Sequence, residues 1–297
     1  MNIIEQIKKH DILLDLLADK EIHYVDVPLY PNIGDHLITH GAFEFFKKNN
    51  IKIKRSIDLY HYSLAWKDEV DVVVFSGGGN LGDIWREHSN ARLDLIGKLR
   101  GKKIIILPQT IRYKDQRNFK EDVSIFNRYE NVYICARDNE SFDYARKMTP
   151  NAYLLPDMAV NLWDRFSVYR EIEATERELN FFRQDKESAL DTIPENSVDW
   201  DLLITKYELR DMYKISKYLN RLLRFGLLGP FSNLCMKLWE KQSLRVIDRI
   251  ARDLSRYSAV NTDRLHVTIL FSLMGRKVIY VDNENSKLSS YISLWGK

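Results

Sequence analysis

Residues suited to binding a small anion gather in the segment NTDRLHVTIL, residues 261–270 of this 297-residue chain. Thr262 is a typical N-cap and Gly275 a typical helix end, so their spacing predicts a helix between them. Arg264 and His266 then lie in the first turn, where unpaired N–H groups and the helix dipole favour a phosphate or carboxylate. An arginine there can bind such a group through two hydrogen bonds, and a histidine beside it can act as a general acid.

His266 also has a structural interpretation. Its spacing places it on the apolar face of the predicted helix, which is typical of a core histidine whose polar atoms are satisfied. Arg183 is a second candidate anion ligand, because it ends a predicted strand and ligands of open parallel sheets bind at the carboxyl ends of strands. The alternative for Arg183 is a surface ion pair with Asp185 or Glu187.

A glycine-rich segment, DVVVFSGGGNLGDIW at residues 71–85, has the glycine spacing of a dinucleotide fingerprint at Gly77, Gly79 and Gly82. A nicotinamide site also needs a helix directly after the glycines and an acidic residue at the end of the next strand. The next predicted strand ends in PQT without an acid, and polar residues interrupt the apolar face of the following helix. Two interpretations remain, a ligand-binding loop in which Asn80 supplies a hydrogen bond, or a purely structural turn.

Other predicted strands are also followed by polar residues. Asn32 and Asp35 stand on either side of a glycine between a strand and a helix, where they either cap the helix or bind a polyhydroxylated substrate. Arg137, Asp138 and Asp157 likewise follow predicted strands. All of these residues would face one cleft if the two halves of the chain stack with their strand ends opposed.

The order of the predicted elements gives the fold class. Strand-like and helix-like segments alternate, which is typical of a parallel sheet flanked by helices. Short apolar runs at residues 71–75 and 102–110 predict strands that are buried on both faces. A charged connector near residue 170 divides the chain into two α/β halves, residues 1–170 and 171–297.

The segment from Lys214 to Lys241 mixes basic residues with Leu, Phe and Trp. One interpretation is a pair of packed helices broken at Gly229 and Pro230. The other is a basic amphipathic hairpin that lies on a membrane surface or a partner protein.

Composition excludes several classes of protein. The net charge of +3 comes from nearly balanced acids and bases, unlike that of a dedicated nucleic-acid binder. Cys135 and Cys235 are too few for a disulfide framework or a metal cluster, so a reducing, cytoplasmic compartment is expected. The N-terminal segment has no signal-peptide core, and no apolar run approaches the roughly 20 residues that span a bilayer.

Eight motifs in order resemble the polysaccharide pyruvyl transferase family, particularly its bacterial exopolysaccharide branch. The resemblance covers roughly residues 23 to 292, and the Lys214 to Lys241 segment is its weakest part. The motifs are PNIGDHLI, VVVFSGGGNLGD, IILPQTI, ARDNES, LLPDMA, FFRQDKES, NTDRLHVTIL and VDNENSKLSSY.

This resemblance implies two Rossmann-like domains that face each other across a cleft, similar to GT-B glycosyltransferases. Residues 1–170 are the expected acceptor side and residues 171–297 the expected donor side. The implied donor is phosphoenolpyruvate, and the implied acceptor is a sugar of an exopolysaccharide or capsule repeat, lipid-linked at the inner face of the membrane. The product is a pyruvate ketal on two sugar hydroxyls, with phosphate released. No cofactor or metal is expected.

The resemblance also implies roles for particular residues. The family's donor-binding arginine and its Arg-Leu-His triplet match Arg183 and then Arg264, Leu265 and His266. His266 is the expected general acid and Arg264 the group that stabilises the departing phosphate. Asp35 is the expected base for a sugar hydroxyl. The other acceptor-binding candidates are Asn32, Asn80, Gln109 and Lys287.

Two other functions fit the same sequence. The first is a GT-B glycosyltransferase that uses a sugar nucleotide and binds its diphosphate through Arg264. The second is a non-catalytic binding protein in which His266 belongs to the core.

Overall fold

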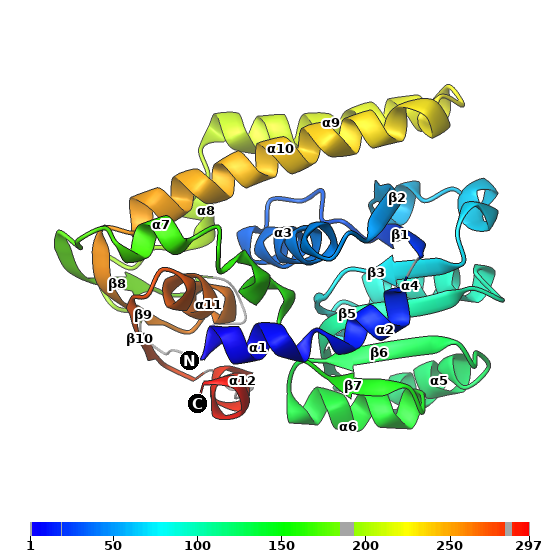
Figure 1. Ribbon diagram of the computed structural model, residues 1–297, viewed down its shortest axis with the longest axis horizontal. Coiled ribbons are helices and arrows are strands. Elements are labelled where there is room, and N and C mark those ends of the chain that lie inside the picture. Colours follow the sequence, from blue (N-terminus) through cyan, green and yellow to red (C-terminus); the bar gives the residue numbers. More distant parts are fainter. Residues whose placement is uncertain (1, 19, 185–192, 283–286, 297) are drawn as a thin grey trace.

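In a computed structural model, the chain forms two parallel sheets (Figure 1). The structure describes residues 2–18, 20–184, 193–282 and 287–296. The larger sheet has the strand order β2-β1-β3-β5-β6-β7, and β4 also pairs with β5. The smaller sheet has the order β10-β9-β8. All pairs of named strands are parallel, so the predicted mixed α/β fold with a mainly parallel sheet is confirmed. The strands are β1 (Glu21–Val25), β2 (Lys52–Ile57), β3 (Val72–Phe75), β4 (Gly78–Gly82), β5 (Lys103–Arg112), β6 (Val132–Ala136), β7 (Ala152–Leu154), β8 (Glu176–Phe181), β9 (Tyr257–Thr262) and β10 (Lys277–Tyr280).

Helices surround both sheets and connect their strands (Figure 1). The α-helices are α1 (Ile3–Lys9), α2 (Ile12–Leu17), α3 (Ile33–Lys48), α4 (Arg86–Lys98), α5 (Gln116–Phe126), α6 (Asn139–Met148), α7 (Ser167–Arg170), α8 (Trp200–Leu203), α9 (Lys206–Arg224), α10 (Leu228–Leu254), α11 (Leu265–Leu273) and α12 (Lys287–Trp295). The short 3₁₀ helices are η1 (Leu59–His61), η2 (Leu64–Glu69) and η3 (Met158–Leu162). In the described part of the chain, no helix has the length and apolar character needed to cross a membrane.

Each sheet has its own hydrophobic cluster. Every residue of β3 is buried, as its continuous apolar run predicts for a strand covered on both faces. The cluster around the smaller sheet also takes in Ile3, Ile33 and Leu37, which come from the N-terminal part of the chain. Helix α10 contributes Trp239 to the first cluster and Ile250 to the second, so it ties the two sheets together. The division of the chain at residue 170 stays a prediction.

The glycine-rich segment forms a strand rather than a turn that leads directly into a helix. β4 pairs with β5, and α4 begins only at Arg86. Gly82 has φ +125°, and a Cβ added there would lie 2.0 Å from the carbonyl oxygen of Arg112, so only glycine fits this pairing. The chain therefore lacks the strand–turn–helix arrangement of a dinucleotide site at this segment, in agreement with the two sequence tests that failed.

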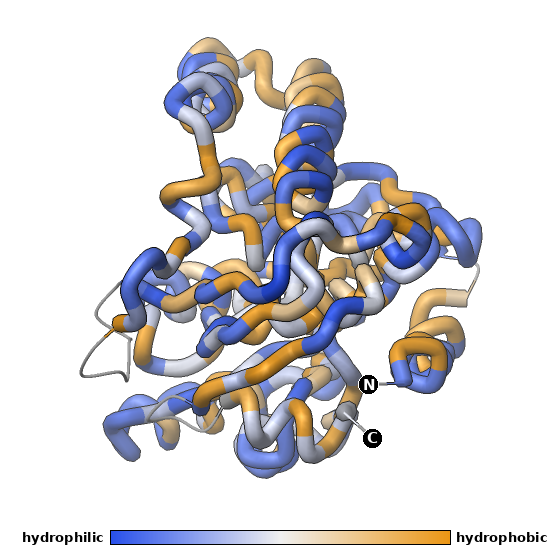
Figure 2. The backbone as a smooth tube through the Cα atoms, turned by 90° about the vertical axis from the view of Figure 1, so that its left-hand side faces the viewer, coloured by the Kyte–Doolittle hydropathy of each residue, from blue (hydrophilic) through white to orange (hydrophobic). Residues whose placement is uncertain are grey.

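Helices α9 and α10 form an antiparallel pair that runs past α3 (Figure 1). Hydrophilic and hydrophobic residues alternate along both helices (Figure 2). The predicted break at Gly229 and Pro230 is wrong, because the chain turns at residues 225–227 with Gly226 at φ +68°. Pro230 lies in the first turn of α10, where a missing N–H costs no helical hydrogen bond.

Candidate active site

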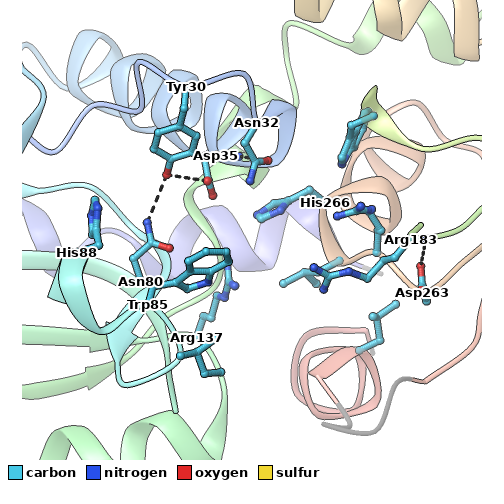
Figure 3. Close-up of a pocket in the computed structure, with 16 residues that line it drawn as sticks. Tyr30, Asn32, Asp35, Asn80, Trp85, His88, Arg137, Arg183, Asp263 and His266 are labelled. Carbon is cyan, nitrogen blue, oxygen red and sulfur yellow. Dashed lines mark hydrogen bonds between the residues drawn. The ribbon is translucent and has the colours of Figure 1, made fainter. Parts of the chain in front are cut away.

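A cavity of about 460 Å³ lies where strands of both sheets end (Figure 3). The segments that follow β1, β3 and β6 line it on the side of the larger sheet, and those that follow β8 and β9 line it on the other. This is the position at which parallel α/β sheets commonly bind ligands. The lining residues are Tyr30, Asn32, Asp35, Gly79, Asn80, Ile84, Trp85, His88, Arg137, Arg183, Trp200, Asp263, Arg264, Leu265, His266 and Leu288.

The start of α11 differs from the sequence prediction. Thr262 is the last residue of β9, because the strand ladder with β8 continues to that position. Arg264 is the N-cap and Leu265 the first helical residue, so the helix begins later than an N-cap at Thr262 would place it. The Thr262 hydroxyl accepts a hydrogen bond from the N–H of Arg264 at 3.0 Å. The guanidinium of Arg264 donates to the buried carboxylate of Asp199, which fixes it at the cavity.

His266 lies in the cavity and makes an ion pair beneath it. Its Nε2 atom is 3.4 Å from the Oδ2 atom of Asp157, and its side chain is 15% exposed. Asp157 also accepts from Arg137 Nη1 at 2.5 Å. Burial opposes ionisation of Asp157, but the contacts with His266 and Arg137 lower the pKa of its carboxyl below the usual range. The carboxylate of Asp157 therefore lies against one ring nitrogen of His266, at the floor of the cavity.

The opposite side of the cavity carries a chain of polar contacts (Figure 3). The Tyr30 hydroxyl donates to Asp35 Oδ2 at 2.9 Å and accepts from Asn80 Nδ2 at 3.3 Å. Burial raises the pKa of the Asp35 carboxyl, which makes its carboxylate a stronger base. Asn32 accepts from the N–H of Gly34 at 3.0 Å, which confirms its capping role, and it also lines the cavity, so substrate binding by Asn32 stays a prediction.

Arg183 lies on the same side of the cavity as Asp263, and His266 lies between them and Asp35 (Figure 3). The backbone N–H of Arg183 donates to Asp263 Oδ1 at 3.0 Å. Asp185 and Glu187, the alternative ion-pair partners of Arg183, lie outside the described residues. The structure therefore brings Arg183, Arg264, Leu265 and His266 to one cavity with Asn32, Asp35 and Asn80.

Three described sequence candidates, Gln109, Asp138 and Asp157, are not among the residues that line this cavity. The side chain of Gln109 is fully buried, and its Nε2 donates to the carbonyl oxygen of Ser76 at 2.7 Å. Asp138 caps α6 through a 2.8 Å hydrogen bond from the N–H of Ser141. Lys287 begins α12, but its side chain lies outside the described part of the structure.

The aromatic residues of the cavity are ones that sequence reasoning missed. Trp85 is 57% exposed and stands at the N-cap of α4. His88 lies one turn further along, and Tyr30 and Trp200 complete the set. The available signal was the interrupted apolar face after the glycines, since a segment without a continuous apolar face does not bury its side chains in the core. Among the described residues, no group of three or more His, Cys, Asp or Glu side chains could hold a metal ion.

The model of the polysaccharide pyruvyl transferase family matches residues 32–285 of the chain, which include residues on both sides of the cavity. The chain belongs to the polysaccharide pyruvyl transferase family. It is therefore a transferase of polysaccharide biosynthesis.

Relatives from a bacterium and a yeast support the assignment to this family. The chain is 32% identical to the pyruvyl transferase candidate EpsO of Bacillus subtilis over 292 residues, covering 95% of this chain and 88% of EpsO. It is 24% identical to Pyruvyl transferase 1 of Schizosaccharomyces pombe, covering 93% and 70% of the two chains. A functionally uncharacterised protein from Klebsiella pneumoniae has a similar fold, with a TM-score of 0.64 and 22% identity over 99% of this chain and 95% of that one.

Proposed function

We propose that this enzyme transfers the pyruvyl group of phosphoenolpyruvate onto two hydroxyls of a sugar in an exopolysaccharide or capsule repeat. The observation that supports this proposal is that two kinds of residue face each other across one cavity. Arg183, Arg264 and His266 are suited to binding an anion, and Asp35 has a carboxyl whose pKa is raised. In this proposal the two sheets carry two Rossmann-like domains similar to those of GT-B enzymes, with the acceptor on the larger sheet and the donor on the smaller.

Phosphoenolpyruvate matches the donor side in charge. It carries a carboxylate and a phosphate on the same carbon, and two guanidinium groups can bind both at once. Arg264 and the N–H of Leu265 begin α11, where the helix dipole favours an anion. The contact with Asp199 holds the Arg264 guanidinium in place before the donor binds, which lowers the entropy lost on binding.

The first step adds a sugar hydroxyl to the donor. His266 delivers a proton to the methylene carbon, so positive charge develops at the adjacent carbon and the hydroxyl oxygen bonds there. Asp35 accepts the hydroxyl proton. Asp157 positions the His266 ring for this transfer, since its carboxylate lies 3.4 Å from Nε2.

The second step closes the ketal. The carbon–oxygen bond to phosphate breaks, the phosphate keeps the electron pair, and Arg264 stabilises its charge. The second sugar hydroxyl then bonds to the same carbon. Asp35 gives the first hydroxyl proton to the departing phosphate and the second hydroxyl proton restores His266, so protons and charge balance without a cofactor.

We propose further that the enzyme acts at the cytoplasmic face of the membrane on a lipid-linked acceptor. The turn between α9 and α10 and the first two turns of α10 expose apolar side chains, among them Phe225 at 68% and Leu234 at 57%. Arg221 and Arg224 lie in the last turn of α9 beside them. Exposed apolar residues next to basic ones suit the interface of an anionic bilayer.

A thermal-unfolding titration tests the donor. Phosphoenolpyruvate is compared with pyruvate, phosphate and uridine diphosphate, because a ligand at 100 times its Kd stabilises the folded state by about 2.7 kcal/mol. We expect selective stabilisation by phosphoenolpyruvate that weakens in Arg183→Ala and Arg264→Ala. Arg117→Ala is the control, since the Arg117 side chain is 90% exposed and remote from the cavity lining.

Two results would contradict the donor proposal. Stabilisation by uridine diphosphate alone would favour a sugar-nucleotide glycosyltransferase. Equal stabilisation of the wild type and both arginine variants would place the donor elsewhere on the chain.

A further inference from the structure

A second cavity of about 190 Å³ adjoins the first. Tyr30 and His88 line both cavities, so the two cavities lie next to each other. The second cavity extends away from Arg183 and Arg264, past the end of β1 and η1 to helix α9. The other residues that line it are Asp26, Val27, Leu29, Asp58, Leu59, Tyr60, Tyr213 and Ser216.

The lining combines exposed aromatic rings with buried carboxylates. Tyr60 is 64% exposed and Tyr213 is 53% exposed, and neither belongs to either hydrophobic cluster. Asp26 and Asp58 are each 7% exposed and supply acceptor oxygens beside the rings. A sugar ring needs this combination, because its C–H faces pack on aromatic rings while its hydroxyls donate to carboxylates.

His88 stands at the junction of the two cavities in a defined orientation. Its Nε2 atom is 3.1 Å from Asp26 Oδ2, which also accepts from Arg92 Nε at 3.0 Å. Burial opposes ionisation of Asp26, but Arg92 and His88 lower the pKa of its carboxyl. Because a carboxylate only accepts hydrogen bonds, the Nε2 atom of His88 carries a proton. In the neutral ring, Nδ1 is then an acceptor for a ligand hydroxyl at the junction.

We propose that the second cavity binds the sugar next to the one that receives the pyruvyl group, so that the enzyme recognises at least a disaccharide. This inference rests on the proposed function, which places the reacting sugar in the first cavity beside Asp35. Tyr60 and Tyr213 pack against the second sugar ring. His88 accepts a hydrogen bond from a hydroxyl near the glycosidic bond between the two sugars. Helix α9 thereby serves acceptor recognition through Tyr213 and Ser216.

Binding to a printed array of bacterial surface oligosaccharides and their component monosaccharides tests the subsite. The oligosaccharide bound most tightly, and the glycoside of its reacting sugar, are then titrated against the wild type, Tyr60→Ala, Tyr213→Ala and Tyr218→Ala. Tyr218 is the matched control, because it is 57% exposed on α9 and lines neither cavity. Loss of a stacked ring is expected to weaken oligosaccharide binding about fivefold or more. Monosaccharide binding should remain the same in all four proteins.

Three outcomes would overturn the subsite. The first is an equal loss of affinity for the oligosaccharide and the monosaccharide, and the second is no loss of affinity in either tyrosine variant. The third is an array on which no oligosaccharide binds more tightly than its monosaccharide. Thermal stabilisation by phosphoenolpyruvate is measured on the same samples. Stabilisation by phosphoenolpyruvate without a loss of oligosaccharide affinity in the tyrosine variants would contradict the subsite and leave the donor proposal standing. A loss of oligosaccharide affinity without stabilisation by phosphoenolpyruvate would contradict the donor proposal and leave the second cavity as a sugar-binding site. Because Tyr60 and Tyr213 are exposed, we expect both alanine variants to fold as the wild type does.

Discussion

The Gly34→Ala variant tests whether the position of His266 matters. Gly34 is the second residue of α3, and a Cβ added there would lie 2.5 Å from His266 Nδ1 and 3.0 Å from its Cγ. Ordinary contact begins near 3.5 Å, so the imidazole must move by about 1 Å. A displacement of about 1 Å at a reacting group can lower the rate by about 100-fold. Helix propensity favours alanine by up to about 1 kcal/mol, which keeps the variant folded.

Phosphate release from phosphoenolpyruvate in the presence of an oligosaccharide acceptor measures the loss. Gly229→Ala is the matched control, because Gly229 is also the second residue of its helix and a Cβ there meets only Trp66, at 3.8 Å. We expect the control to keep its activity and its melting temperature. A Gly34→Ala enzyme that retains activity within twofold of the wild type would refute the reasoning, because His266 would then have no geometric role in the reaction.

Two further predictions concern Asp35 and the α9–α10 turn. Asp35→Asn should lose activity yet unfold at a higher temperature near pH 7.5, because burial raises the folded-state pKa of Asp35 and so its ionised form destabilises the fold. This stability difference should disappear as the pH falls below the unfolded-state pKa, where Asp35 is protonated in both states; a difference that grows in acid would contradict it. Vesicles of phosphatidylglycerol should carry the wild type in a flotation assay but not Phe225→Glu or Leu234→Glu.

The flotation assay has its own control in Val168→Glu. Val168 is 58% exposed on α7, so this variant adds the same charge to an exposed apolar position away from the turn. It should float as the wild type does. Equal flotation of all the variants, or no binding by the wild type, would remove the membrane contact.

The sequence alone was sufficient to predict features that depend on residues close together in the chain. Continuous apolar runs predicted the buried strands β3 and β5, because a strand covered on both faces needs apolar residues at every position. The placement of Arg264 and His266 at the start of a helix followed from the residue types and spacing of the segment, and both residues line the cavity. The choice between a core histidine and a cavity histidine did not follow, since the inward face of α11 contacts both environments.

Only the tertiary structure decided which side chains meet. His266 pairs with Asp157 and Tyr30 accepts from Asn80 because loops after different strands converge at the same cavity. Pairing between strands distant in sequence also extended β9 to Thr262 and so moved the start of α11. Local periodicity determines whether a segment forms a strand or a helix and which of its faces is apolar. The contacts of the site depend instead on how separate strands and helices pack, and a single sequence segment carries no information about its distant partner.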